Sequence, residues 1–113
     1  MTSMRVPNAE RAFIDISKLR DYALNPTHRV GGHKARLFAS LLGMNGNDAD
    51  DLRDILRTII RTQEATLGEL DEYGQRYVID FLLTWQQQQA SVRSAWIVRS
   101  DEDFPRLVTC YPL

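Results

Sequence analysis

The spacing of apolar residues changes period near the middle of this chain, and this change restricts the fold more than any other feature. In the first half, apolar residues recur three and four positions apart, which is typical of helices with one buried face. After Tyr73-Gly74 the period drops to two. Helices followed by strands predict an α+β fold, with three N-terminal helices packed on an antiparallel meander sheet of 3–4 strands. We expect residues 1–113 to form a single α+β domain.

Two helices are expected before residue 45. The first runs from Ile14 to Ala23, and Asp15 or Ser17 can cap its N-terminus. The second runs from about Gly32 to Leu42, and Gly43 ends it. Its apolar spacing predicts one shared face made of Lys34, Leu37, Phe38 and Leu41.

The third helix has the clearest pattern. Asn47 or Asp48 can cap it, and acidic residues fill its first turn, where the helix dipole favours negative charge. Its predicted buried stripe consists of Leu52, Ile55, Leu56, Ile59 and Ile60.

Three strands are expected in the second half. The first has its core face at Tyr77, Ile79, Phe81 and Leu83. Turns at Gln86–Gln89 and Ser100–Asp103 separate it from two more strands, at Val92–Val98 and Arg106–Tyr111. The segment Glu64–Glu72 is compatible with a loop or with an extra edge strand.

Composition excludes several classes of protein. The net charge of −1 provides no global positive field for generic nucleic-acid binding, so a polyanion would have to bind a local patch. A single cysteine, Cys110, excludes an internal disulfide and fits a reducing compartment. No apolar run reaches the ~18 residues of a membrane span, and the first residues do not resemble a signal peptide. We therefore expect a cytoplasmic protein that does not contact the membrane.

A cationic loop stands out between the first two helices. The segment Leu24–Lys34 contains His28, Arg29, His33 and Lys34, together with Pro26 and the pair Gly31-Gly32. Cations and freely oriented backbone N–H groups at a helix start form a natural anion site. The loop therefore indicates phosphate binding or phosphate chemistry.

A series of short motifs resembles a bacterial family of small proteins classed only as a domain of unknown function. The resemblance covers about residues 7–112, and its order and spacing are more specific than any single motif. The motifs are Pro7-Asn8-Ala9, Ala12-Phe13-Ile14, Lys18-Leu19, Tyr22-Ala23-Leu24, His28, Gly31, Lys34-Ala35, Phe38, Leu42-Gly43, Tyr73-Gly74, Trp96-Ile97-Val98 and Pro105-Arg106-Leu107-Val108-Thr109. Similar sequences occur as C-terminal toxin tips of contact-dependent inhibition proteins. By fold-level analogy these tips resemble the barnase–EndoU–colicin–RelE group of metal-independent ribonucleases.

The resemblance implies a catalytic site for RNA cleavage without a metal or other cofactor. Such a reaction needs a base, an acid and cations that stabilise the crowded phosphorane. His28 is the best acid or base candidate, because an ordinary histidine titrates near neutral pH. Lys34 can place its charge at a helix start, and Arg106 and Thr109 match the family's last-strand motif. In a regular strand Arg106 and Thr109 point to opposite faces, so both can serve one site only through a bulge or at a strand end.

The implied partners are RNA, with tRNA as one option, and a small cognate antitoxin protein that covers the cationic loop. The residues leave two alternatives open. One is a non-catalytic module that binds protein or nucleic acid, and the other is a different enzyme that uses an anion or a dinucleotide. The oligomeric state is not predicted.

Each candidate residue also has a structural explanation. His28 can brace its own loop, and Lys34 can lay its apolar stem along core residues. Arg106 can form a rim ion pair with Glu102 or Asp103, and Thr109 suits a strand by propensity. The remaining expectations are a surface role for His33, core positions for Tyr22 and Trp96, and a buried, inert Cys110.

Overall fold

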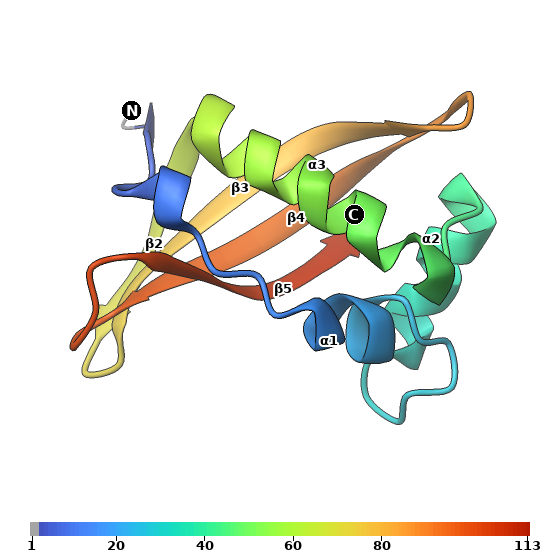
Figure 1. Cartoon of the computed structure of the whole chain (residues 1–113), viewed down its shortest axis with the longest axis horizontal. Coiled ribbons are helices and arrows are strands. Elements are labelled where there is room, and N and C mark those ends of the chain that lie inside the picture. The colour runs from blue at the N-terminus through green and yellow to red at the C-terminus, as the bar shows by residue number, and fades with distance from the viewer. Residues whose placement is uncertain (1–2) are drawn as a thin grey trace.

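A five-stranded antiparallel sheet forms one layer of the molecule in the computed structural model, which describes residues 3–113 (Figure 1). The spatial order follows the chain: β1 (Ser3–Met4), β2 (Ala65–Asp71), β3 (Gly74–Trp85), β4 (Gln88–Arg99) and β5 (Pro105–Pro112). The predicted α+β fold with an antiparallel meander is confirmed, and the sheet has five strands where 3–4 were predicted. The open question about residues 64–72 is answered too, because β2 pairs with β3 as a strand and the short β1 lies outside it.

Apart from the short edge strand β1, which precedes them, the helices come before the strands, as predicted. They are α1 (Ile16–Lys18), α2 (Gly32–Leu42) and α3 (Ala49–Thr62), with 3₁₀ turns η1 (Ala9–Arg11) and η3 (Gly46–Asp48) and a π-helical turn η2 (Leu19–Ala23). Asp15 caps α1, because its Oδ1 accepts a hydrogen bond from Ser17 N at 3.0 Å. The prediction that one regular helix covers residues 14–23 is wrong, since α1 starts two residues later and η2 replaces its second turn.

The bounds of α2 agree with the prediction, but its buried face agrees only in part: Phe38 is buried and Leu37 partly buried. The side chains that α2 buries are Ala35, Phe38 and Leu42, whereas Lys34 and Leu41 are exposed. The helix is thus rotated so that Lys34 points away from the core. Gly43 ends α2 in the left-handed region with φ of 70°, as expected of a C-terminal glycine.

The core lies between α3 and one face of the sheet (Figure 1). The helix contributes Leu52, Leu56 and Ile60, and Ile55 and Ile59 pack at its margin, so the predicted stripe is confirmed. The sheet contributes the predicted face of β3 and, from β4, Val92 and Trp96. Trp96 is fully buried and donates from Nε1 to Ser94 Oγ at 3.0 Å, which confirms its expected core position.

The β5 strand carries two features that shape the functional surface. The segment at Phe13 runs alongside its edge, with Phe13 N donating to Pro105 O at 2.8 Å and Leu107 N donating to Phe13 O at 3.0 Å. Further along, a bulge interrupts pairing with β4, so Val108 has no cross-strand partner of its own. The bulge changes which β5 side chains share a face.

No helix within residues 3–113 has the length and apolar character needed to cross a membrane.

Candidate functional site

His28 is held by the backbone of its own loop. Its Nδ1 accepts hydrogen bonds from Val30 N and Gly31 N, both at 3.1 Å, and its carbonyl accepts from Gly32 N at 2.9 Å. The ring stands edge-on to Tyr22, with 4.5 Å between the ring centroids. Because Nδ1 accepts two N–H groups, this pattern assigns the ring proton of the neutral imidazole to Nε2. His28 therefore has Nε2–H as the group free to meet a ligand.

Lys34 lies on the first turn of α2 and is exposed. Its Nζ sits 3.9 Å from the ring centroid of Tyr111, a distance typical of a cation–π contact. Lys34 forms no ion pair with any carboxylate in the described part of the chain. Its charge is thus positioned by an aromatic ring and is not neutralised by a neighbouring acid.

His28, Lys34 and Thr109 line the same open cleft, which has a volume of about 560 Å³ and is called here the His28 cleft. The three residues come from the loop, from α2 and from β5. The other lining residues are Ser17, Lys18, Asp21, Tyr22 and Val108. Two lysines and three hydroxyl-bearing side chains beside an imidazole N–H suit an anionic ligand such as a phosphodiester.

Arg106 does not line the His28 cleft. Its guanidinium pairs with both carboxylate oxygens of Glu102 at 2.7 Å and lies 5.0 Å from the Phe13 ring centroid and 5.1 Å from that of Phe104. The hydrogen bond from Arg106 keeps the pKa of Glu102 below its ordinary value. The alternative of an ion pair with Glu102 is confirmed.

The bulge at Val108 places Thr109 and Arg106 on one face of the sheet. Thr109 pairs with Ala95 and Arg106 pairs with Ile97, and these two β4 residues are two positions apart. Sequence reasoning required such a bulge if both residues were to serve one site. The structure contains it, yet Arg106 lines a neighbouring cleft, while Thr109 lines the first one together with His28 and Lys34.

Several residues near the site were missed in the sequence, and another, Tyr22, was expected to lie elsewhere. Asp21 is the one carboxylate that lines the His28 cleft, and Tyr22 forms part of its wall, where a core position was expected. Tyr111 contacts both Lys34 and Arg93, and Arg93 in turn pairs with Asp80 at 2.8 and 2.9 Å. The hydrogen bond from Arg93 lowers the pKa of Asp80. Only cross-strand register links Tyr111 to Arg93, and a single sequence does not supply that register.

The other sequence candidates lie outside the cleft. His33 is exposed on α2, as expected for a surface residue. Cys110 is 2% exposed, and burial raises the pKa of its thiol to about 12, which fits the expected inert cysteine. Within residues 3–113, no three His, Cys, Asp or Glu side chains are grouped so that they could hold a metal ion.

The architecture and the cleft define a small α+β protein with N-terminal helices, an antiparallel meander and a cationic site beside its last strand. The chain belongs to the family described as "Domain of unknown function (DUF6883)", whose model matches residues 5–113. None of the curated proteins compared with this chain is significantly similar to it in sequence.

The fold is similar to that of a chain in a solved structure described as a contact-dependent growth inhibition toxin–immunity protein complex from Klebsiella pneumoniae 342. The TM-score is 0.67 and the sequence identity is 16%. The similarity covers 88% of this chain and 98% of that one. At this identity the likeness concerns the fold.

Proposed function

We propose that this protein is a toxin-type ribonuclease that cleaves RNA phosphodiesters without a metal ion and is held in check by a small immunity protein. One observation carries the proposal: His28, Lys34 and Thr109, which belong to three different segments, line a single cleft. The fold shared with a chain of a toxin–immunity complex supports the same proposal as an analogy.

The charge of Lys34 suits the stabilisation of a phosphorane. Metal-free cleavage joins the 2′-oxygen to phosphorus and breaks the bond to the 5′-oxygen, and negative charge builds up on the non-bridging oxygens. Lys34 carries no neutralising ion pair within residues 3–113, and Lys18 lines the same cleft. We assign charge stabilisation to Lys34. We assign to the Thr109 hydroxyl group a hydrogen bond to the phosphate.

The reaction also moves one proton from the 2′-hydroxyl to the departing 5′-oxygen. The cleft offers Asp21 as a carboxylate acceptor and His28 Nε2–H as a donor. His28 becomes an effective acid when it is fully protonated, which requires Nδ1 to release the N–H groups of Val30 and Gly31. We therefore infer that proton transfer by His28 is coupled to a rearrangement of the loop.

A non-catalytic binding module is the second candidate. Two hydrogen bonds at His28 Nδ1 favour it, because they give His28 a structural role in holding the loop, and this role needs no catalysis. The solved complex contains a toxin and an immunity protein, and a fold likeness does not distinguish their roles.

Expression of the chain alone separates the two candidates. We expect the wild-type chain to arrest bacterial growth and to produce discrete fragments on electrophoresis of total RNA. The Lys34→Met variant, which keeps an apolar stem and removes the charge, should be harmless at the same protein level. Growth that is unaffected by the wild-type chain, with intact RNA, would favour the binding module.

A further inference from the structure

A second cleft opens directly beside the His28 cleft. It has a volume of about 680 Å³, within the range of small-ligand pockets, and Lys18 and Val108 line both clefts. Its other lining residues come from the segment 13–15, from the β2–β3 and β4–β5 turns, from the end of β4 and from β5; they include Phe13, Tyr73, Arg99, Ser100 and Arg106. We call it the Tyr73 cleft. A chain-like ligand bound at one cleft can therefore extend into the other without leaving the surface.

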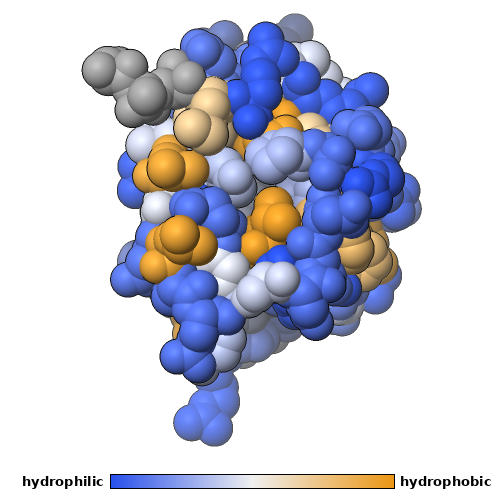
Figure 2. Space-filling view, turned by 90° about the vertical axis from the view of Figure 1, so that its left-hand side faces the viewer, coloured by the Kyte–Doolittle hydropathy of each residue, from blue (hydrophilic) through white to orange (hydrophobic). Residues whose placement is uncertain are grey.

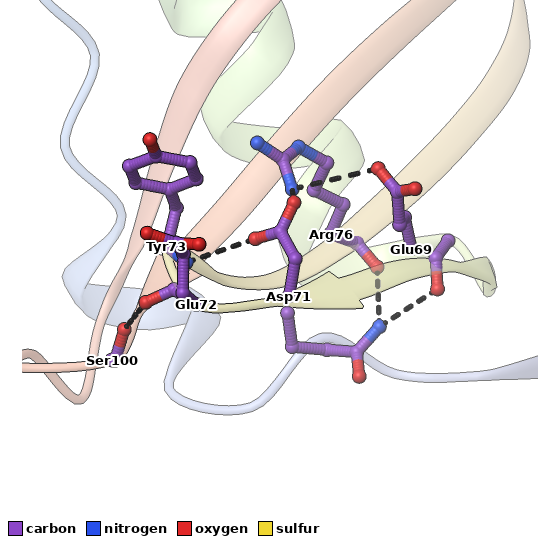
Figure 3. Close-up of polar contacts among 8 residues, drawn as sticks. Glu69, Asp71, Glu72, Tyr73, Arg76 and Ser100 are labelled. Carbon is purple, nitrogen blue, oxygen red and sulfur yellow. Dashed lines mark hydrogen bonds and ion pairs between the residues drawn. The ribbon is translucent and has the colours of Figure 1, made fainter.

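Tyr73 is an exposed aromatic residue on a firmly held turn (Figure 3). The residue is 65% exposed, but its backbone is fixed on both sides. Tyr73 N donates to Asp71 Oδ1 at 2.9 Å, and Tyr73 O accepts from Ser100 N at 3.1 Å. Ser100 Oγ also donates to Glu72 O at 2.6 Å, which ties the β2–β3 turn to the end of β4. Because this backbone is already fixed, only the side chain of Tyr73 has to be ordered when its ring stacks on a ligand.

The rest of the cleft suits a flat, uncharged ring better than a phosphate. Phe13 is 46% exposed on one wall, and the Arg106 guanidinium beside it is already neutralised by Glu102. The lining includes Lys18, Arg99 and Arg106 as cations, balanced by Asp15, Glu72 and Asp101. Such a lining has no net charge to attract an anion, but it offers hydrogen-bond donors and acceptors for a heteroaromatic edge.

The surface around the two turns does not resemble a large protein interface. In the view of Figure 2, which looks onto the side carrying the β2–β3 and β4–β5 turns, apolar side chains form small separate patches in a mostly hydrophilic surface. Protein interfaces bury a more continuous, apolar centre. The cleft therefore fits a small planar group better than a docked protein.

We propose that the Tyr73 cleft binds a nucleobase of single-stranded RNA, stacked against Tyr73, next to the phosphate that the His28 cleft holds. This inference rests on the proposed function, because it extends the same RNA ligand into a second cleft. Stacking on aromatic side chains is the usual way in which proteins hold unpaired bases.

The test uses nuclear magnetic resonance of the ¹⁵N-labelled full chain with uncleavable probes. The probes are 2′-O-methyl dinucleotides of each of the four bases and one dinucleotide that lacks a base at one position. The backbone amides of Tyr73 and Ser100 report on the Tyr73 cleft, and those of Val30 and Gly31 report on the His28 cleft. Three variants are compared: Tyr73→Leu, Tyr73→Phe, which keeps the ring, and Leu82→Ala, an exposed residue that lines neither cleft.

We expect base-containing probes to shift both sets of amides, and the abasic probe to shift the Tyr73 set much less. Tyr73→Leu should weaken binding of a base-containing probe about ten-fold or more, as loss of one stacking contact does, while Tyr73→Phe and Leu82→Ala bind like the wild type. Shifts confined to Val30 and Gly31, or equal affinity of Tyr73→Leu, would overturn this inference and leave the proposed function intact. Shifts confined to Tyr73 and Ser100 would support the base site and contradict the phosphate site, and an absence of shifts at both clefts would contradict both proposals.

Discussion

The hydrogen bonds of His28 decide which of its ring nitrogens meets a ligand. A histidine in a glycine-rich cationic loop is a good candidate from residue type alone. The hydrogen bonds in the structure add that Nδ1 accepts from backbone N–H groups of the loop and that Nε2 carries the proton. The position of the Lys34 ammonium group is likewise set by one contact, the cation–π contact with the ring of Tyr111.

Cys110 should be inert in the folded protein. Its side chain is 2% exposed, and burial raises the pKa of the thiol to about 12, so the reactive thiolate is scarce at neutral pH. We expect no reaction with a thiol reagent such as dithionitrobenzoate at pH 8 until denaturant is added. Rapid stoichiometric labelling of the native protein would show that the strand around Cys110 opens.

The Glu102–Arg106 pair should make stability depend on pH. The pKa of Glu102 is lowered in the folded state by the hydrogen bond from Arg106, so its contribution is present above the ordinary glutamate pKa. The contribution is lost as the pH falls through the lowered folded-state pKa. We expect Glu102→Gln to reduce the free energy of unfolding at pH 7, and the difference from wild type to vanish in acid.

Urea unfolding of both proteins between pH 7 and pH 2 measures this effect. Glu72→Gln is a matched control, because Glu72 is exposed and has no cation at salt-bridge distance within residues 3–113. A difference for Glu102→Gln that stays constant over the whole range would contradict the account.

At the scale of elements, strong periodicity makes the fold predictable. The stripe of α3 and the alternation of β3 identify both elements and their buried faces, because each pattern holds over several turns or residue pairs. Prediction fails where the pattern is short: α1 is only three residues long, and the apolar spacing of α2 points to Leu41, although Ala35 and Leu42 are the buried residues. An alanine is a weak signal of burial in a sequence.

The part of the candidate site formed by His28 and Lys34 is predictable, because its residues are close together in sequence. The loop and the start of α2 are neighbours in sequence, so His28 and Lys34 can be associated from the sequence alone. Thr109, Asp21 and Tyr22 join them only through tertiary packing. Arg106 stays outside this group, in the ion pair with Glu102 that its sequence position also allowed. The bulge at Val108, which puts Arg106 on the same face as Thr109, has no clear signature in a single sequence.

Substitutions in the turn of the β3–β4 hairpin should stabilise the protein. Gln86 and Gln87 both adopt positive φ, at 49° and 71°, which costs side-chain-bearing residues about 1 kcal/mol or more each. Asn-Gly is favoured in such two-residue turns. We expect the double substitution Gln86→Asn and Gln87→Gly to raise the free energy of unfolding by about 1 kcal/mol and the melting temperature by about 4 °C.

Thermal unfolding followed by circular dichroism checks this prediction. The control is Gln88→Gly, one position further on and inside β4, where glycine lowers strand stability. A double variant that melts at or below the wild-type temperature would show that the turn is not strained.

At the scale of the whole molecule, the cationic loop is the expected contact of an immunity protein. It projects Val30, which is 74% exposed, beside Arg29, although the chain as a whole has a net charge of −1. An acidic partner surface would complement this loop and block the His28 cleft. The partner would thus neutralise the protein by covering its ligand site.

Affinity purification of tagged Lys34→Met from its native cells tests this contact. We expect a small protein in stoichiometric amount, whose co-expression restores growth to cells that produce the wild-type chain. Val30→Asp should reduce its recovery, whereas Leu82→Asp, at an exposed apolar position on β3, should not. Recovery of no such protein, or equal recovery with Val30→Asp, would contradict the proposed contact.

Cleavage of RNA by the purified chain in excess EDTA tests the central claim most directly. We predict fragmentation of total RNA by the wild type and by His33→Ala, whose exposed side chain lines neither cleft. His28→Ala and Lys34→Met should cleave ~10²–10⁴-fold more slowly, as expected for loss of a positioned catalytic group, with melting temperatures close to the wild type. Full activity in both variants, activity lost only through unfolding, or activity abolished by EDTA would contradict a metal-independent ribonuclease site at His28 and Lys34.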